Sequence, residues 1–299
     1  MGYMDDIFLD SMDRWADNGY EYDERMEYAL TAYEEWSKNL NNTQKKQLAK
    51  LIEGFQYYSS KRIDSILSNL HKQAVTRYAI SNNDTVVSVV RKKNGMLGSS
   101  SDYWLRYQLA SGMSKRIFYD TLDEIGRIEW ENISKVVFVD DCSGSGETFI
   151  KFLGRQKQDF SGKLIILLTI EMMKEAERVI KDFAKTNGLW IECIYYNLQD
   201  KALKVFSSTE VDEFVQLSQS REINKNEIKG YKFSEALMAF YNNTPNNTLG
   251  IFRCTTPKNT PLFPRKNEEE AGWKRNKFKS GKRKRQQYNA KVIGEDNGL

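Results

Sequence analysis

Four short apolar runs alternate with helical patterns in the middle of this 299-residue chain, and they constrain its fold most strongly. The runs cover residues 85–90, 135–139, 163–168 and 190–196. Amphipathic patterns at helical spacing cover residues 147–158 and 172–183 between them. Continuous apolar strands separated by helices are typical of a parallel sheet that is covered on both faces. The sequence therefore predicts an α/β fold with a Rossmann-like parallel sheet.

The segments on either side of this core have different patterns. Apolar positions recur at three- and four-residue steps over residues 22–40 and 63–78, which predicts a helical N-terminal module. Short helices are expected at residues 212–219 and 233–241, and all four prolines lie between residues 245 and 264, so a loop-rich C-terminal extension follows. The expected domains are a helical module (1–82), an α/β core (83–200), a C-terminal extension (201–272) and a basic tail (273–299).

Composition excludes several classes of protein. An apolar fraction of 40% favours a folded chain, and no uncharged apolar run reaches the roughly 18 residues that a membrane helix needs. The acidic start does not resemble a signal peptide, so we expect a soluble cytoplasmic protein. Three cysteines without CxxC spacing and a single histidine, His71, favour neither a disulfide framework nor a zinc site. A structural role is the simpler interpretation of His71.

The stretch VVFVDDCSGSGETF, residues 136–149, carries the clearest functional signal. An apolar strand runs into two adjacent acids and then into a loop of small residues, an arrangement that local stability does not explain. A P-loop would need glycine at Asp141 and lysine at Glu147, and a dinucleotide fingerprint would need glycine at Phe149. Both motifs therefore fit poorly. An ordinary strand-to-helix turn needs one capping residue, whereas this stretch supplies six polar ones.

The same stretch resembles the ribose-phosphate loop of type I phosphoribosyltransferases. The resemblance implies that Asp140 and Asp141 accept hydrogen bonds from the ribose hydroxyls and act as the catalytic pair. It also implies that the following loop wraps the 5′-phosphate of phosphoribosyl pyrophosphate (PRPP), with backbone amides and hydroxyls as donors. The expected loop residues are Cys142, Ser143, Gly144, Ser145, Gly146, Glu147 and Thr148.

The family resemblance extends to a cationic segment and also shows two departures. Arg91, Lys92 and Lys93 follow an expected strand where the family binds pyrophosphate, with Mg²⁺ bridging its oxygens; a solvated strand end is the alternative. Gly144 stands where purine-handling members place an Asp base, so ordinary purine salvage is not favoured. Glu147 adds a carboxylate to a phosphate loop, which requires that it point away from the phosphate.

The order of the segments is similar to that of the PRTase-CE group, phosphoribosyltransferase-like proteins with a C-terminal extension. This resemblance implies an effector of retron-type anti-phage defence, with a reverse transcriptase and its RNA–DNA product as partners. The leading hypothesis is an enzyme that transfers or cleaves at C1′ of PRPP or a related ribose 5-phosphate compound. The alternatives are a catalytically inactive nucleotide sensor and a structural nucleic-acid-binding subunit. Nucleophilic catalysis by Cys142 is not favoured, because no partner base is identifiable.

The basic tail predicts contact with nucleic acid. Residues 274–299 carry nine Lys and Arg against two acids, a net charge of +7. The preceding 273 residues carry 36 Lys and Arg against 39 acids, a net charge of −3. Cations next to aromatic side chains suit phosphate contact and base stacking, although a flexible solubilising tail has the same composition. The candidate phosphate contacts are Lys274, Arg275, Lys277, Lys279, Lys282, Arg283, Lys284 and Arg285.

Overall fold

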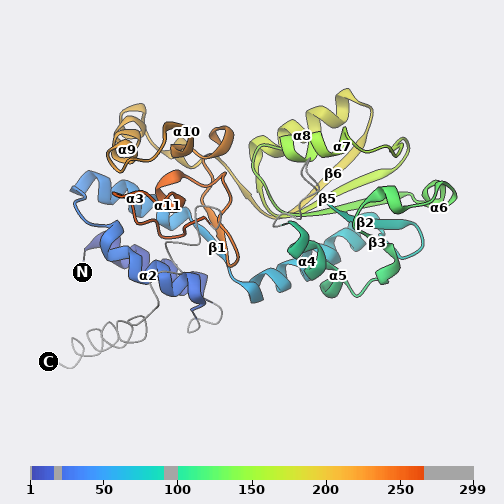
Figure 1. The fold of residues 1–299 in the computed structure, drawn as a ribbon, viewed down its shortest axis with the longest axis horizontal. Helices are drawn as coiled ribbons and strands as arrows, with labels where there is room; N and C mark the ends of the chain where they lie inside the picture. Colours follow the sequence, from blue (N-terminus) through green and yellow to red (C-terminus); the bar gives the residue numbers. More distant parts are fainter. Residues whose placement is uncertain (1, 17–21, 91–99, 266–299) are drawn as a thin grey trace. The chain divides into compact units, whose positions relative to one another are not determined.

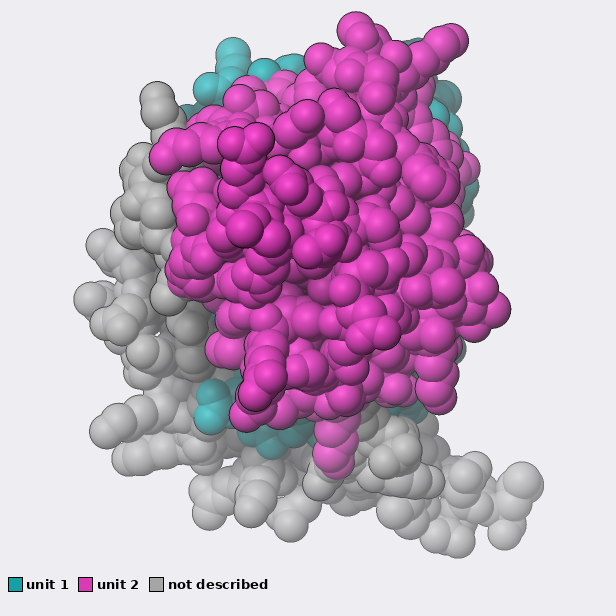
Figure 2. Space-filling view, turned by 90° about the vertical axis from the view of Figure 1, so that its right-hand side faces the viewer, with its two compact units in different colours: residues 1–59, 202–299 teal, residues 60–201 magenta. Residues whose placement is uncertain are grey.

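The computed structural model describes residues 2–16, 22–90 and 100–265, and the chain forms two compact units. Unit 1 combines Met1–Ser59 with Ala202–Leu299, and unit 2 is Ser60–Lys201 (Figure 2). The division differs from the expected domains at the N-terminal boundary, because helix α4 (Ser60–Tyr78) packs on the sheet strands of unit 2. The expected helical module and C-terminal extension otherwise contribute to the same unit.

Unit 2 contains a five-stranded parallel sheet, which confirms the predicted α/β fold class. The strand order is β3-β2-β4-β5-β6. The strands are β2 (Thr85–Val89), β3 (Phe118–Tyr119), β4 (Lys135–Ser143), β5 (Leu164–Met173) and β6 (Trp190–Gln199). All ten residues of β5 are buried, as expected for a central strand covered on both faces.

Helices cover both faces of this sheet (Figure 1). Helices α4 and α5 (Ser100–Ser111) pack together on one face, and α7 (Glu147–Leu153) and α8 (Lys174–Thr186) lie on the other. The apolar stripe of α4 is buried at Ile63, Ile66, Leu67, Leu70 and Ala74. Shorter elements complete the unit: η1 (Lys115–Ile117), η2 (Leu122–Glu124) and α6 (Arg127–Asn132).

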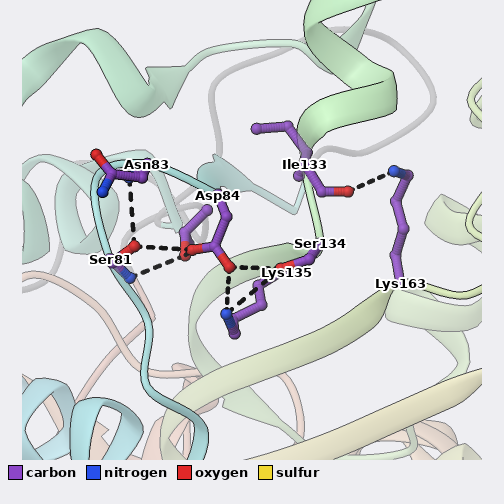
Figure 3. Close-up of polar contacts among 8 residues, drawn as sticks. Ser81, Asn83, Asp84, Ile133, Ser134, Lys135 and Lys163 are labelled. Atoms are coloured by element: carbon purple, nitrogen blue, oxygen red, sulfur yellow. Dashed lines mark hydrogen bonds and ion pairs between the residues drawn. The ribbon is translucent and has the colours of Figure 1, made fainter.

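The amino end of the sheet is held by a cluster of polar contacts around Asp84 (Figure 3). Its carboxylate accepts hydrogen bonds from the hydroxyls of Ser134 and Ser81, at 2.6 and 2.8 Å, and forms an ion pair with Lys135. Burial alone would raise the pKa of Asp84, but the hydrogen bonds from these three partners outweigh it and lower the pKa to about 2. The charged carboxylate therefore ties the start of β2 to the start of β4.

Unit 1 is built from helices around a short two-stranded parallel sheet, in which β1 (Gln56–Tyr58) pairs with β7 (Met238–Phe240). The helices before β1 are α1 (Tyr3–Trp15), α2 (Glu24–Trp36) and α3 (Asn42–Gly54). The later elements are η3 (Ala202–Val205), α9 (Ser208–Ser220), α10 (Lys225–Ile228), η4 (Tyr231–Phe233) and α11 (Gly250–Arg253). The unit thus depends on segments from both ends of the described chain.

Aromatic side chains form the core of unit 1. The Phe55 ring stacks on Phe263 with a centroid distance of 5.1 Å, and the Trp15 ring contacts the edges of both. The Trp15 indole nitrogen donates to the Phe55 carbonyl at 2.9 Å, and the Trp36 indole nitrogen donates to the Ile251 carbonyl at 3.0 Å. Buried tryptophans with satisfied N–H groups give apolar contact without an unpaired donor.

Several local predictions are wrong. Residues 233–241 were expected to be helical, but Phe233 and Glu235 have φ values of 54° and 53°, and residues 238–240 form β7. A positive φ is incompatible with a right-handed helix, and pairing with β1 supplies the backbone hydrogen bonds instead. Met172 and Met173 were expected on a helix, but they end strand β5. Strands β4, β5 and β6 each run several residues beyond their expected ends.

Candidate functional site

The order of the parallel strands identifies one place in unit 2 where a ligand site is expected. Numbered within this sheet, the strands run 2-1-3-4-5, so the chain leaves β2 and β4 toward opposite sides. In such sheets ligands bind at the carboxyl ends of the two strands where the direction reverses. Strand β2 pairs with β4 as far as Val89 and Val139, whereas β4 continues beside β5 to Ser143. Residues 140–143 therefore extend β4 beyond its pairing with β2.

The two acids of the motif lie in this extension. They lie within strand β4, rather than in a loop beyond it, and Asp140 is in register with Thr169 of β5. Asp140 is 9% exposed, and Asp141 is partly exposed. One carboxylate oxygen of Asp140 accepts the Asp141 backbone N–H at 3.0 Å, and one of Asp141 accepts the Cys142 N–H at 2.8 Å. These local bonds fix the direction of both carboxylates.

Strand alternation directs the two acids to opposite faces of the sheet. Asp140 lies on the same side as Phe138, whose ring contacts Phe149 and Phe152 of α7 at centroid distances of 5.7 and 5.2 Å. Asp141 points to the other side, which α4 and α5 cover. A single ligand can reach both carboxylates only at the edge of β4, where its pairing with β2 has ended.

The glycine before α7 is required by both backbone and packing. Gly146 has φ 75° and ψ −21°, in the left-handed region. A Cβ atom at this position would lie 3.0 Å from the Ala176 carbonyl oxygen and 3.2 Å from Cγ1 of Ile180, both on α8. The loop therefore sits directly on α8, and a side chain at residue 146 would displace it.

The other motif residues form the turn between β4 and α7. Ser143 and Gly144 are buried, Ser145 is partly exposed and Thr148 is exposed. The Glu147 carboxylate accepts a hydrogen bond from the Lys151 ammonium at 2.7 Å, one helical turn along α7. This contact engages the charge of Glu147 on the surface of its own helix.

Comparison with known families connects this geometry to a group of proteins. The PRTase-CE family model matches residues 33–265, which include the α/β sheet, the acid pair and the turn before α7. The chain belongs to the PRTase-CE family. The solved Helicobacter pylori Xanthine-Guanine-Hypoxanthine Phosphoribosyltransferase is similar to it with 12% sequence identity and a TM-score of 0.31, over 52% of this chain and 96% of that chain. Among curated proteins, no match is found.

Cys142 of this PRTase-CE protein is poorly suited to act as a nucleophile. Burial raises the pKa of its thiol well above the usual value, and the nearby carboxylates of Asp141, Asp140 and Glu171 raise it further. The thiol therefore stays protonated at neutral pH, whereas nucleophilic catalysis requires the thiolate.

Three polar residues near the acid pair were missed in the sequence. Glu171 on β5 is fully buried and lies in register with Cys142, and Asn197 of β6 donates from Nδ2 to its Oε1 at 2.8 Å. Thr169 is also fully buried, lies in register with Asp140, and its hydroxyl has no hydrogen-bond partner among the described residues. A glutamate inside the run LIILLTIEMM is the signal that could have identified this group.

The remaining candidates are His71, which has a structural contact, and two groups of cations that lie outside the described residues. His71 Nδ1 lies 3.0 Å from the hydroxyl of the buried Tyr107, and burial lowers the pKa of the imidazole, so a structural role fits. Arg91, Lys92, Lys93 and the tail cations from Lys274 to Arg285 lie outside the described residues. In the described part of the chain, no group of three or more His, Cys, Asp or Glu could hold a metal ion. No helix in that part is long and apolar enough to cross a membrane.

Proposed function

We propose that this PRTase-CE protein binds PRPP or a related ribose 5-phosphate compound and transfers or cleaves at its C1′ carbon. One observation carries the proposal: the acid pair and the Gly146 turn lie together at the carboxyl ends of parallel strands, at the point where the strand order reverses. This is where doubly wound α/β sheets bind nucleotides. Family membership supports the same class of ligand.

The proposed roles follow from the chemistry of each group. The carboxylates of Asp140 and Asp141 accept hydrogen bonds from the two ribose hydroxyls, one from each side of the β4 edge. The turn from Ser143 to Thr148 offers backbone N–H groups and hydroxyls to the 5′-phosphate. As the C1′ bond breaks, positive charge develops on the ribose ring, and nearby carboxylates stabilise an oxocarbenium-like state.

The leaving pyrophosphate and its metal ion remain predictions. Arg91 to Lys93 are the proposed cations for the pyrophosphate. Mg²⁺ would neutralise charge on the same phosphate oxygens. The Glu147–Lys151 ion pair is compatible with a bound phosphate, since the cation neutralises the carboxylate next to the turn.

Titration calorimetry with PRPP and Mg²⁺, followed by an assay for released pyrophosphate, tests the proposal. We expect the wild type to bind PRPP, and Asp140→Asn and Asp141→Asn to lose at least tenfold in affinity, about 1.4 kcal/mol for one charge-assisted hydrogen bond. Asp182→Asn, at an exposed position of α8, is the matched control and should bind like the wild type. Absence of PRPP binding by the folded wild type would refute the proposal.

A non-catalytic sensor is the second candidate, and one feature favours it. Gly144 occupies the position where purine-handling members place a base. PRPP binding without release of pyrophosphate would support the sensor, whereas release that depends on Asp140 and Asp141 would support the enzyme. Partnership with a reverse transcriptase and its RNA–DNA product is a further proposal from the family resemblance, which copurification of the three components would test.

A further inference from the structure

A short turn in unit 1 exposes two aromatic residues on a backbone with unusual dihedral angles. The turn covers residues 230–235, sequence GYKFSE, and includes η4. Lys232, Phe233 and Glu235 have positive φ values of 54°, 54° and 53°. Positive φ is uncommon for residues other than glycine and is rare for a bulky residue such as Phe. Tyr231 and Phe233 are 42% and 63% exposed, so the chain accepts this strain without burying either ring.

Contacts with residues 246 and 247 hold the turn in this conformation. The Tyr231 N–H donates to the Asn246 carbonyl at 2.7 Å, and Nδ2 of Asn247 donates to the buried Ser234 hydroxyl at 3.1 Å. Gly230 has φ 71° and ψ 172°, a region that essentially only glycine occupies. A Cβ atom there would overlap the Asn247 carbonyl oxygen and lie 2.7 Å from its carbonyl carbon. The backbone that carries the two rings is therefore already ordered, which lowers the cost of binding a partner.

Neither the exposed rings nor the positive φ values stabilise the fold. A polar side chain would leave less apolar surface in water, and Asn would fit a positive φ better than Phe does. Strained backbone that its surroundings enforce is characteristic of ligand-binding and other functional segments. The combination of strain and exposure at Phe233 therefore indicates a binding surface.

The segments that form and contact this turn carry four lysines and two acids. Residues 202–205, which include η3, contact the turn because the Leu203 N–H donates to the Glu235 carboxylate at 3.2 Å. That carboxylate is 7% exposed and also lies 3.9 Å from the Lys229 ammonium. The second acid, Glu227, forms an ion pair with the buried Arg253. Both acids are thus engaged, and the exposed side chains give the surface a positive charge; they are Lys204, Lys225 and Lys232.

We propose that these residues form a binding surface for single-stranded nucleic acid, on which bases stack against Tyr231 and Phe233. The cations that contact the phosphates are Lys204, Lys225 and Lys232. Aromatic rings stack on the faces of unpaired bases with little regard to sequence, whereas a duplex hides those faces. A protein partner fits less well, because lysine is depleted at protein–protein interfaces. The surface lies in unit 1 and the proposed ribose site in unit 2, so the inference does not depend on PRPP binding.

The two rings add base contacts to a strand that the basic tail is expected to hold by its phosphates. Phosphate contacts release counterions and set the dependence of affinity on salt. Stacking depends on the presence of bases and leaves that dependence unchanged. The two contributions can therefore be separated in the full chain.

Fluorescence anisotropy with a labelled oligothymidine strand measures the contribution of the rings. Tyr231→Ala and Phe233→Ala should each lower the affinity about tenfold, about 1.4 kcal/mol, with the same salt dependence as the wild type. Oligouridine should show the same loss, since neither stacking nor phosphate contact reads the sugar. An abasic strand of equal length should bind both variants and the wild type alike. Tyr3→Ala is the matched control, because Tyr3 is 63% exposed on α1 of the same unit, and it should bind oligothymidine like the wild type.

Two further variants separate binding from folding. Phe233→Asn should have the same urea midpoint as the wild type or a higher one, because Asn tolerates positive φ, and should still lose about tenfold in affinity. Lys232→Gln should reduce the salt slope by about 0.7, as expected for one phosphate contact with a single strand. Unchanged affinity in the Tyr231→Ala/Phe233→Ala double variant would overturn the inference and favour a protein as the partner of these rings. An equal loss of affinity for the abasic strand, or no binding of either oligonucleotide by the wild type, would also overturn it.

Discussion

Replacing Gly146 by alanine tests the packing of the ligand turn against α8. The substitution imposes a left-handed φ of 75° on a residue with a side chain, at a cost of about 1 kcal/mol. It also places a methyl group 3.0 Å from the Ala176 carbonyl oxygen and 3.2 Å from Ile180 Cγ1. Relief of that contact requires the turn or α8 to shift, which adds about 1–3 kcal/mol.

Gly162 provides a control that separates the two contributions. It has nearly the same φ, 72°, and lies in the same unit, but a Cβ atom there would have no atom within 4 Å. Gly162→Ala should therefore lose only the backbone contribution, about 1 kcal/mol, whereas Gly146→Ala should lose about 2–4 kcal/mol. The difference between the two variants measures the contact with α8.

Urea denaturation followed by circular dichroism gives both free energies of unfolding, and thermal unfolding gives an independent check. For a unit of this size, the expected loss in Gly146→Ala corresponds to about 5–15 °C in Tm. Equal losses in Gly146→Ala and Gly162→Ala would refute the reasoning, because they would show that residue 146 has free space around it. Weaker PRPP binding by Gly146→Ala at a temperature where it remains folded would connect the turn to the ligand.

Three further predictions address other parts of the chain. Asp84→Asn should lower the free energy of unfolding by about 1–2 kcal/mol above about pH 4, because it removes the stabilising charge. The wild type itself should lose this stabilisation as pH falls toward 2, and urea denaturation between pH 2 and 7 measures both effects. Lys163→Met should cost about 1–3 kcal/mol, since its ammonium donates to the Trp130 carbonyl at 2.8 Å and also to that of Ile133. Deletion of residues 274–285 should abolish binding to single-stranded DNA. In the full chain, the logarithm of the affinity for this DNA should fall by about 4 per log unit of salt concentration if five cations contact phosphates. Binding that does not depend on salt would contradict this prediction.

Much of unit 2 was predictable because its signal is local. A buried parallel strand needs a continuous apolar run, and each crossover helix needs an apolar stripe, so the order of strands and helices can be inferred from periodicity. Unit 1 depends on contacts between residues 56–58 and 238–240, which lie far apart in the sequence. The short apolar run around Met238 fits a helix or a strand equally well, and only the distant partner β1 decides between them.

The position of the motif in the fold was predictable to a similar degree, whereas the role of its residues in ligand binding stays a prediction. The acid pair and Gly146 stand in a pattern whose chemistry is recognisable, and the structure brings them to the end of β4. Glu171 and Asn197 were missed because the expected strands ended several residues too early. A strand end is hard to locate when polar residues continue in the strand conformation, as Thr169 and Glu171 do inside β5.

The two ends of the sheet place carboxyl groups in different surroundings. At the carboxyl end, Glu171 is fully buried and accepts a hydrogen bond from Asn197. At the amino end, Asp84 is partly exposed, and the hydrogen bonds from its partners lower its pKa, so its charge stabilises the fold. Asp84→Asn should therefore destabilise the protein at pH 7 and have much less effect at pH 2, where the wild-type carboxyl group is largely protonated. Urea denaturation at both pH values tests this, and an equal loss at pH 2 and pH 7 would show that the charge of Asp84 does not stabilise the fold.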